Sequence, residues 1–272
     1  MDVAPLLLSC AACGFDAPKR DGIWIFAPEF TPAGFLRERR NHLAELEPRH
    51  FWFRSRLMLL QACLHRFTRG GGHALELGCG AGSFLVQLAE GFTTLTGVDA
   101  YAESLIAAHQ RVPSATLIQA DACRVPLASA QFDMVAALDV LEHVCAEELL
   151  REARRLLTER GLLLLTVPAS LSLMSKADEV MGHRCRYRLS DLRGELERAR
   201  FRLLYHTYYQ FLLFPLVWLA RHLPLSVGWN LERRPPVVVS SLLQSINDAE
   251  VTWFQGKSLP WGSSLVAIAA AS

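Results

Sequence analysis

A short glycine cluster constrains this chain more than any other feature. Residues 74–84 read ALELGCGAGSF, in which an apolar run carries Glu76 and is followed by Gly78, Gly80 and Gly82. Glycine tolerates positive φ angles and lets a ligand approach the backbone closely. Three glycines where a strand gives way to a helix therefore predict a ligand-binding turn, with the N–H groups of the helix directed at the ligand.

The residues beyond the cluster alternate between short apolar runs and helical spacing. The strand-like runs are 73–78, 94–98, 116–119, 134–138, 162–167 and 202–208, with a last one in SSLVAIAAA at 263–271. The segment 146–159 repeats apolar residues at helical intervals, and Gly161 is placed to cap it. This alternation predicts an α/β fold, with a parallel sheet covered by helices on both faces.

Glycines at 70–72 mark the clearest boundary along the chain. We expect an N-terminal segment with a C-x-x-C pair at 1–30 and a helical cover or lid at 31–70. The large α/β domain would then occupy 71–272 and carry a helical insertion at about 209–245.

Two ligands compete for a glycine-rich turn after the first strand. Dinucleotide folds use G-x-G-x-x-G, but Ser83 occupies the third glycine position and Gly82 falls one residue early. S-adenosylmethionine has no pyrophosphate, and Glu76 before the turn suits its amino group. The spacing favours S-adenosylmethionine and disfavours a nicotinamide-dependent oxidoreductase.

Carboxylates follow the next strands. Asp99 ends the second strand, where a carboxylate accepts hydrogen bonds from ribose hydroxyls in nucleotide folds. Asp121 follows the third strand and can take the adenine amino group, and Asp139 follows the fourth. The alternatives are ordinary turn chemistry for the glycines and a helix N-cap for Asp99.

Together these motifs resemble the class I S-adenosylmethionine-dependent methyltransferases of the small-molecule type. The matching segments are ELGCGAG (76–82), GVDA (97–100), QADA (119–122), FDMVAALDVLEHV (132–144) and GLLLLTVP (161–168). The resemblance implies a Rossmann-like, seven-stranded, mostly parallel sheet with a reversed last strand. It also implies cofactor contacts from Glu76, Gly78, Gly80, Gly82, Asp99, Ala100, Asp121 and Ala122, with Leu138 and Asp139 against the methionine end.

The segment MGHRCRYRLSDL resembles an H-x-R-x-Y pattern of a bacterial, methyltransferase 11/23-like subset of this superfamily. We expect His183, Arg186 and Tyr187 to contact the acceptor, because loops after strand ends carry specificity. The alternative is a surface loop whose arginines are solvated or paired with Asp178 and Glu179.

His143 is a second candidate base. Because the same motif recurs in methyltransferases with unrelated acceptors, a structural or cofactor-side role for His143 is the alternative.

A metal-dependent O-methyltransferase is a further alternative. Asp139-x-x-Glu142-His143 resembles the E-x-x-E-H motif of certain quinone-pathway and RNA-end O-methyltransferases, and His183 could complete a set for Mg²⁺, Mn²⁺ or Zn²⁺. The shorter Asp139 and the presence of this string in metal-free relatives lead us to expect no metal. We also expect no zinc at Cys10 and Cys13, because no second C-x-x-C follows.

Two apolar segments adjoin the expected site. Phe51, Trp52 and Phe53 could form a lid over cofactor and acceptor, or could dock an N-terminal helix onto the domain. Residues 209–223 could roof an apolar acceptor pocket or contact a membrane, and Pro215 with the low charge favours a roof.

Composition narrows the remaining classes. The net charge of +1 gives no sign of a nucleic-acid-binding surface. No run approaches the ~18 apolar residues of a membrane span, and the N-terminus lacks the features of a secretory signal, so a cytoplasmic location is expected. The expected reaction is methylation of O, N or C in a small, partly apolar biosynthetic metabolite, with a homodimer possible. The main rival is a catalytically silent S-adenosylmethionine-binding subunit.

Overall fold

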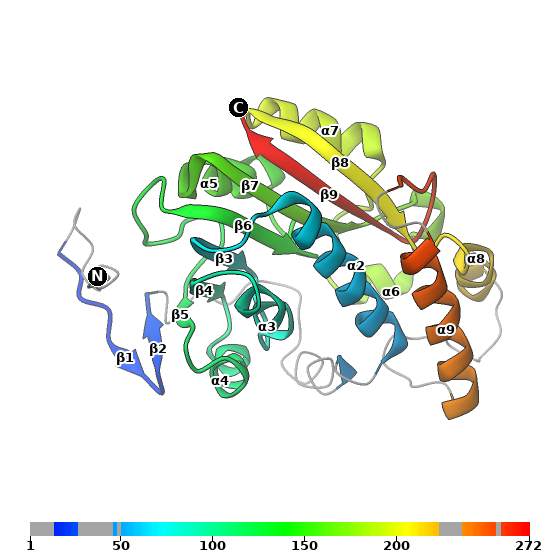
Figure 1. Ribbon diagram of the computed structural model, residues 1–272, viewed down its shortest axis with the longest axis horizontal. Coiled ribbons are helices and arrows are strands. Elements are labelled where there is room, and N and C mark those ends of the chain that lie inside the picture. The colour runs from blue at the N-terminus through cyan, green and yellow to red at the C-terminus, as the bar shows by residue number, and fades with distance from the viewer. Residues whose placement is uncertain (1–13, 27–45, 48–49, 223–235, 254–256) are drawn as a thin grey trace.

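A computed structural model describes residues 14–26, 46–47, 50–222, 236–253 and 257–272 (Figure 1). The predictions for Cys10 and Cys13, for residues 31–45 and 48–49 of the expected cover and for the middle of the insertion lie outside these residues.

One nine-stranded sheet forms the centre of the molecule, in the order β1-β2-β5-β4-β3-β6-β7-β9-β8. The strands are β1 (Lys19–Arg20), β2 (Ile23–Ile25), β3 (His73–Leu77), β4 (Thr94–Asp99), β5 (Thr116–Gln119), β6 (Phe132–Leu138), β7 (Leu157–Pro168), β8 (Phe201–Tyr209) and β9 (Ser264–Ala271). Strands β3 to β7 pair in parallel, and β9 runs antiparallel between β7 and β8. Strands β3 to β9 confirm the predicted sheet with its reversed last strand.

Helices cover both faces of the sheet, as predicted. They are α2 (Phe51–Phe67), α3 (Ser83–Ala89), α4 (Ala102–Arg111), α5 (Ala146–Leu156), α6 (Lys176–Val180), α7 (Leu189–Arg198), α8 (Phe214–His222) and α9 (Val237–Trp253). Strand residues alternate between the two faces, so Leu163 and Leu165 pack with α5 and α7 while Leu164 packs with α2, α3 and α4. Figure 1 shows α2 lying across the sheet beside α9.

The N-terminal hairpin extends the sheet at one edge. Strand β2 pairs in parallel with β5, and the N–H of Phe26 donates to the carbonyl of Gln119 at 3.0 Å. Ile23 is buried in the same apolar cluster as α2, α3 and α4. The described part of the expected 1–30 segment therefore shares the sheet of the large domain, and the boundary at 71 stays a prediction.

The expected end of the helix at 146–159 is wrong. Helix α5 ends at Leu156, and β7 begins with the next residue, so Gly161 lies in a strand and caps no helix. A Cβ on Gly161 would lie 3.0 Å from the carbonyl oxygen of Phe132 and 2.7 Å from Leu157 Cδ2. Close approach of two strands therefore explains this glycine. The apolar residues at 156 and 157 suit a helix and a strand equally well, so the sequence pattern could not show that the helix ends and the strand begins between them.

A buried hydroxyl ties three elements together behind the site. Tyr209 at the end of β8 donates to the carbonyl of Trp52 in α2 at 2.9 Å and accepts from Asn247 Nδ2 of α9 at 2.9 Å. Both Tyr209 and Asn247 are inaccessible to solvent. The position of α2 over the sheet therefore depends in part on this hydroxyl.

We expect Tyr209→Phe to lower the free energy of unfolding by about 1–3 kcal/mol, because it leaves the buried Asn247 amide without the hydroxyl to which it donates. Tyr205→Phe is the matched control, since the Tyr205 hydroxyl donates to Lys257 at an exposed position and its loss should change stability by less than about 0.5 kcal/mol. Urea denaturation followed by circular dichroism measures both. Equal losses in the two variants would contradict this role of Tyr209.

Candidate active site

The glycine turn between β3 and α3 has the geometry expected of a ligand-binding turn. Gly78, Gly80 and Gly82 all have positive φ angles, of 74°, 52° and 81°. A Cβ on Gly78 would collide with Val140, whereas a Cβ on Gly80 would meet no atom within 4 Å. The backbone at Gly80 therefore faces open space, where a ligand can contact it directly.

Glu76 lies at the base of this turn with one oxygen unsatisfied. Its side chain is 3% exposed, and Oε2 has no hydrogen-bond partner among the described residues. Burial and the nearby Glu47 carboxylate raise the pKa of Glu76 well above its usual value, although Arg56 opposes this. A buried, unsatisfied carboxylate of this kind suits the amino group of S-adenosylmethionine, and that contact stays a prediction.

Asp99, at the tip of β4, is held rigidly beside the turn. Its Oδ2 accepts from the N–H of Gly80 at 2.9 Å, and its Oδ1 accepts from the N–H of Tyr101 at 2.9 Å. These two bonds fix the carboxylate at the mouth of the turn and leave it further acceptor capacity for ribose hydroxyls.

The tip of β5 lies next to the tip of β4. Gln119 Nε2 donates to the carbonyl of Ala100 at 3.1 Å, which joins the two strand ends. Asp121 Oδ1 accepts from the N–H of Cys123 at 2.9 Å, and Ala122 lies between them in the same turn. The predicted ribose and adenine residues are therefore adjacent in space.

Asp139, after β6, takes part in an ion pair of which the sequence shows no direct sign. Arg56 of α2 makes a close ion pair with Asp139 Oδ2, and Thr166 Oγ1 donates to Oδ1 at 2.9 Å. Burial acts to raise the pKa of Asp139, but Arg56 and Thr166 hold it below its usual value. The Arg56 guanidinium also lies over the Trp52 ring, 4.5 Å from its centroid.

Arg56 is therefore a site residue that sequence reasoning missed. One signal could have found it: Arg56 lies four residues after Trp52 and four before Leu60, on the face of the helix that packs inward. An arginine on the buried stripe of an amphipathic helix needs a partner, and here that partner is Asp139.

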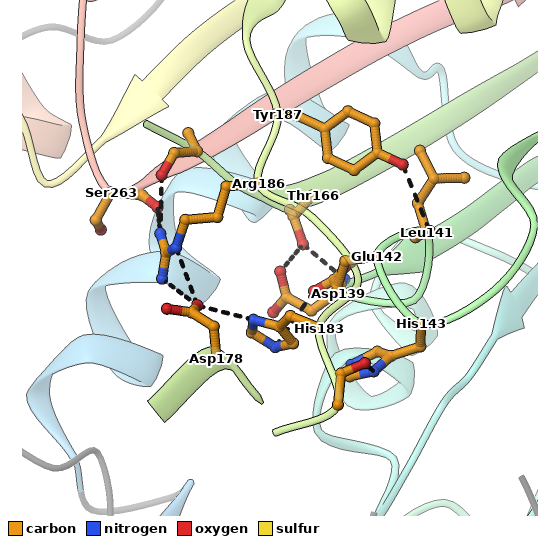
Figure 2. Close-up of polar contacts among 12 residues, drawn as sticks. Asp139, Leu141, Glu142, His143, Thr166, Asp178, His183, Arg186, Tyr187 and Ser263 are labelled. Atoms are coloured by element: carbon orange, nitrogen blue, oxygen red, sulfur yellow. Dashed lines mark hydrogen bonds and ion pairs between the residues drawn. The ribbon is translucent and has the colours of Figure 1, made fainter. Parts of the chain in front are cut away.

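The loop after β7 is built around Asp178. His183 Nδ1 lies 3.0 Å from Asp178 Oδ1, and Arg186 donates to the same oxygen from Nε at 2.9 Å and from Nη2 at 2.6 Å (Figure 2). Arg221 of α8 donates to Asp178 Oδ2 at 2.6 Å. Asp178 is almost inaccessible to solvent, and burial acts to raise its pKa. The hydrogen bonds from His183 and Arg186 and the charges of both arginines outweigh this and lower the pKa far below its usual value.

Arg186 therefore pairs with Asp178. From the sequence alone, this pairing is the alternative to contact between Arg186 and the acceptor. It also donates to the carbonyl of Ala169 at 2.8 Å and is buried. Tyr187 is buried as well, with its hydroxyl 3.5 Å from the carbonyl of Leu141. The direct acceptor contacts predicted for Arg186 and Tyr187 stay predictions, and the contacts described here orient the loop that carries His183.

Glu142 and His143 meet His183 beside this loop. Glu142 is 1% exposed, and neither of its carboxylate oxygens has a hydrogen-bond partner among the described residues. Burial lowers the pKa of His143 to about 4, so the imidazole is neutral at pH 7. The His143 and His183 rings meet edge to face, with centroids 5.0 Å apart. The structure therefore groups Glu142 and His143 with His183, while Asp139 is engaged by Arg56 and Thr166.

The aromatic residues at the start of α2 help to dock this helix onto the rest of the domain, which is one of the two roles that the sequence predicted for them. Phe51 is buried with Leu213 and Leu243, and the Trp52 ring lies 6.1 Å from the Tyr209 ring. Phe53 is half-buried and meets the Trp52 ring edge-on. The lid role stays a prediction.

Known proteins resemble this chain in sequence. Residues 75–165 match the family described as a methyltransferase domain. A "Probable S-adenosylmethionine-dependent methyltransferase" of Mycobacterium tuberculosis is 29% identical over 140 residues, which cover 51% of this chain and 50% of that protein. Nodulation protein S of Azorhizobium caulinodans is 30% identical over 137 residues, which cover 47% of this chain and 64% of the relative.

Solved structures show the same fold. A methyltransferase of Haloferax volcanii, in complex with the Trm112 methyltransferase activator, superposes with a TM-score of 0.59 at 16% identity. The superposition covers 86% of this chain and 96% of that one.

The chain has the Rossmann-like fold of this solved structure. Within that fold, residues 75–165 resemble a methyltransferase domain, and the Mycobacterium relative is named as dependent on S-adenosylmethionine. The similarity spans about half the length of the Mycobacterium relative. Within the described residues, no helix combines the length and the apolar character needed to cross a membrane.

We expect Asp99→Asn to weaken binding of S-adenosylhomocysteine by roughly 10- to 150-fold, because it removes a charge-assisted acceptor. Asp133→Asn is the matched control: Asp133 Oδ2 also accepts a backbone N–H, from His73, but at the opposite end of β3. Isothermal titration calorimetry measures both affinities. Unchanged affinity in Asp99→Asn would remove Asp99 from the site.

The Arg56–Asp139 pair predicts a second effect. Arg56→Leu should lower the free energy of unfolding by about 1–3 kcal/mol, because it leaves a mostly buried carboxylate without its cation. The double variant Arg56→Leu/Asp139→Asn should recover part of that loss. A double-mutant cycle by urea denaturation measures the coupling, and strictly additive losses would show that the pair contributes nothing.

Proposed function

We propose that the protein transfers a methyl group from S-adenosylmethionine to O, N or C of a small, partly apolar acceptor. One observation carries the proposal: Glu76, Asp99 and Asp121 lie at the tips of the adjacent strands β3, β4 and β5, around an open glycine turn. This arrangement offers an acidic partner to each of the amino, ribose and adenine groups. Bound there, S-adenosylmethionine supplies an electrophilic methyl group.

Each residue around the cleft has a distinct task in this proposal. Glu76 binds the amino group with its unsatisfied oxygen, and Asp99 accepts the ribose hydroxyls. Asp121 and Ala122 bind the adenine edge. Arg56 is near enough to act on the charges of both Glu76 and Asp139, so its guanidinium can neutralise the carboxylate at the methionine end.

The acceptor side is formed by His143 and His183 together with the half-buried rings of Trp52 and Phe53. His183 is 13% exposed at its side chain and is oriented by Asp178, so it can contact an acceptor without a change in the loop. His143, neutral at pH 7, can accept a proton from an acceptor that must lose one. The aromatic rings favour an acceptor with an apolar part, of the kind found among natural products, lipids and glycan-pathway metabolites.

Alignment of acceptor and methyl group, more than acid–base chemistry, would supply most of the rate. The contacts at Asp99 and Asp178 fit that requirement. Two backbone N–H groups hold the Asp99 carboxylate, and Asp178, itself held by Arg186, makes one hydrogen bond to His183. A residue that only positions the acceptor should affect turnover much more than cofactor affinity.

We expect tight binding of S-adenosylhomocysteine and none of NAD⁺ in calorimetry. With S-adenosylmethionine carrying a trideuterated methyl group, mass spectrometry of an acceptor panel should detect a labelled product. The panel should sample hydroxyl, amine and carbon acceptors with apolar chains. Binding of NAD⁺ in place of S-adenosylhomocysteine would overturn the proposal, and cofactor binding without turnover across the panel would favour a silent binding subunit.

His183→Gln should lower turnover at least tenfold and leave S-adenosylhomocysteine affinity within about threefold, which separates an acceptor role from a cofactor role. His65→Gln, at an exposed position of α2, is the control and should match the wild type. Wild-type turnover in His183→Gln would exclude His183 from the acceptor site.

A further inference from the structure

Three side chains beside the cofactor cleft could serve as metal ligands. Glu142 and His143 follow β6, and His183 follows β7. One ligand atom from each lies within 4.8 Å of the other two. Figure 2 shows Glu142 and the two imidazoles close together at the ends of these strands. We propose that Glu142, His143 and His183 bind one divalent transition-metal ion, Mn²⁺ or Zn²⁺.

Glu142 provides the strongest sign of a cation-binding site. Its side chain is buried, neither oxygen has a hydrogen-bond partner among the described residues, and its ion-pair contact with His183 is long, with Nε2 at 3.9 Å from Oε1. A carboxylate withdrawn from water without partners is costly, and native proteins retain such groups chiefly where a ligand completes them. A cation between Glu142 and the two imidazoles would satisfy it.

The contacts behind the ligands resemble those of built metal sites. A metal-binding histidine usually gives its second ring nitrogen to a carboxylate or carbonyl, which fixes the ring. His183 Nδ1 lies 3.0 Å from Asp178, and His143 Nδ1 lies 3.3 Å from the carbonyl of Gly182. For His183 this leaves Nε2, which lies 3.9 Å from Glu142 Oε1, as the coordinating atom.

Asp178 is itself fixed by Arg186 and Arg221, so the carboxylate that supports His183 is rigid. Arg186 is buried because it fixes Asp178, the carboxylate that supports His183. Contact with an acceptor would not explain this burial.

The distances fit an ion after small side-chain movements. Metal bonds of about 2.0–2.2 Å place two ligands of one ion roughly 3.0–4.2 Å apart. The 3.9 Å between His183 and Glu142 is already in this range. The widest separation needs a closure of about 1 Å, which rotation of the half-buried imidazoles can provide.

The donor set selects the class of metal. Two imidazoles and one carboxylate suit Zn²⁺, Mn²⁺ or Fe²⁺ better than the oxygen-preferring Mg²⁺ or Ca²⁺. Three protein ligands also leave at least one coordination position open. The sequence argued against a metal because Asp139 is shorter than the glutamate of the motif and because the same string occurs in metal-free relatives. In the structure Asp139 is engaged by Arg56, and the other three candidate ligands, Glu142, His143 and His183, lie together.

The open position would face the acceptor side of the cleft, because both imidazoles are partly exposed there while Glu142 is buried behind them. An oxygen atom of the acceptor could bind there and be oriented toward the methyl group. This role rests on the proposed methyltransferase function, whereas the metal site itself does not. With a metal bound, contact with the acceptor passes from the imidazoles to the ion, and His143 no longer accepts a proton.

The test is metal binding by the whole chain, stripped with chelator and free of cofactor and acceptor. Mn²⁺ titration followed by electron paramagnetic resonance, and Zn²⁺ titration by calorimetry, should each give one ion at this site. Glu142→Gln and His183→Gln should lower Mn²⁺ affinity at least 100-fold, and Asp178→Asn should lower it roughly 10- to 100-fold through His183. His65→Gln and Glu250→Gln, an exposed histidine and a buried glutamate elsewhere, should bind as the wild type does.

Two further measurements distinguish this site from zinc binding at the cysteine pair. Cys10→Ser/Cys13→Ser removes that pair, which can hold Zn²⁺ but has little affinity for Mn²⁺, so Mn²⁺ binding should persist in that variant. If Glu142→Gln fails to fold in a thermal melt, the spectrum of Co²⁺ bound to the cysteine variant decides: visible bands of a nitrogen and oxygen site are expected.

The proposal is overturned if the wild type binds neither Mn²⁺ nor Zn²⁺, or if folded Glu142→Gln and His183→Gln bind Mn²⁺ like the wild type. Zn²⁺ binding that depends on the cysteine pair alone overturns it as well. None of these results bears on cofactor binding, which S-adenosylhomocysteine titration tests separately, so failure of the metal site and failure of the methyltransferase proposal are distinguishable.

Discussion

The hydrogen bond from the N–H of Gly80 to the Asp99 carboxylate is the contact on which the proposed cofactor site depends. It joins the turn after β3 to the tip of β4, and it forms only because Gly78 and Gly80 take positive φ angles. The same turn holds the end of β3 in place, which sets the position of Glu76 beneath the cleft. A side chain on Gly78 would collide with Val140, so the turn, the carboxylate and the strand order constrain one another.

Charge balance explains how several carboxylates coexist in one buried region. Glu76, Asp139 and Glu142 lie close enough for their ionisation to be linked through Arg56 and one another. Arg56 pairs with Asp139, whose pKa is lowered, while burial raises the pKa of Glu76 and Glu142. One arginine cannot neutralise three carboxylates. The other two keep buried oxygens without hydrogen-bond partners among the described residues, and it is these oxygens that suit the ligands proposed above, an ammonium group at Glu76 and a metal ion at Glu142.

The sequence was most informative where function is local in the chain. Residues 76–82, Asp99 and Asp121 each lie at a strand end, and the periodicity located the strands, so their convergence followed from the parallel sheet. Arg56 and Arg221 were not assigned because their partners lie far along the chain: Arg56 meets a residue 83 positions away, and Arg221 reaches Asp178 across 43 positions. Pattern reasoning has no access to such pairings. The end of α5 was misplaced because apolar residues at 156 and 157 suit either element.

The network around Asp178 joins the helical insertion to the acceptor side of the site. Arg221 of α8 donates to Asp178, to the Ser175 hydroxyl and to the carbonyl of Leu173, so one side chain spans the loop after β7. Asp178 in turn holds His183. A displacement of α8 would therefore remove one of the two arginines that neutralise Asp178 and loosen the carboxylate that orients His183.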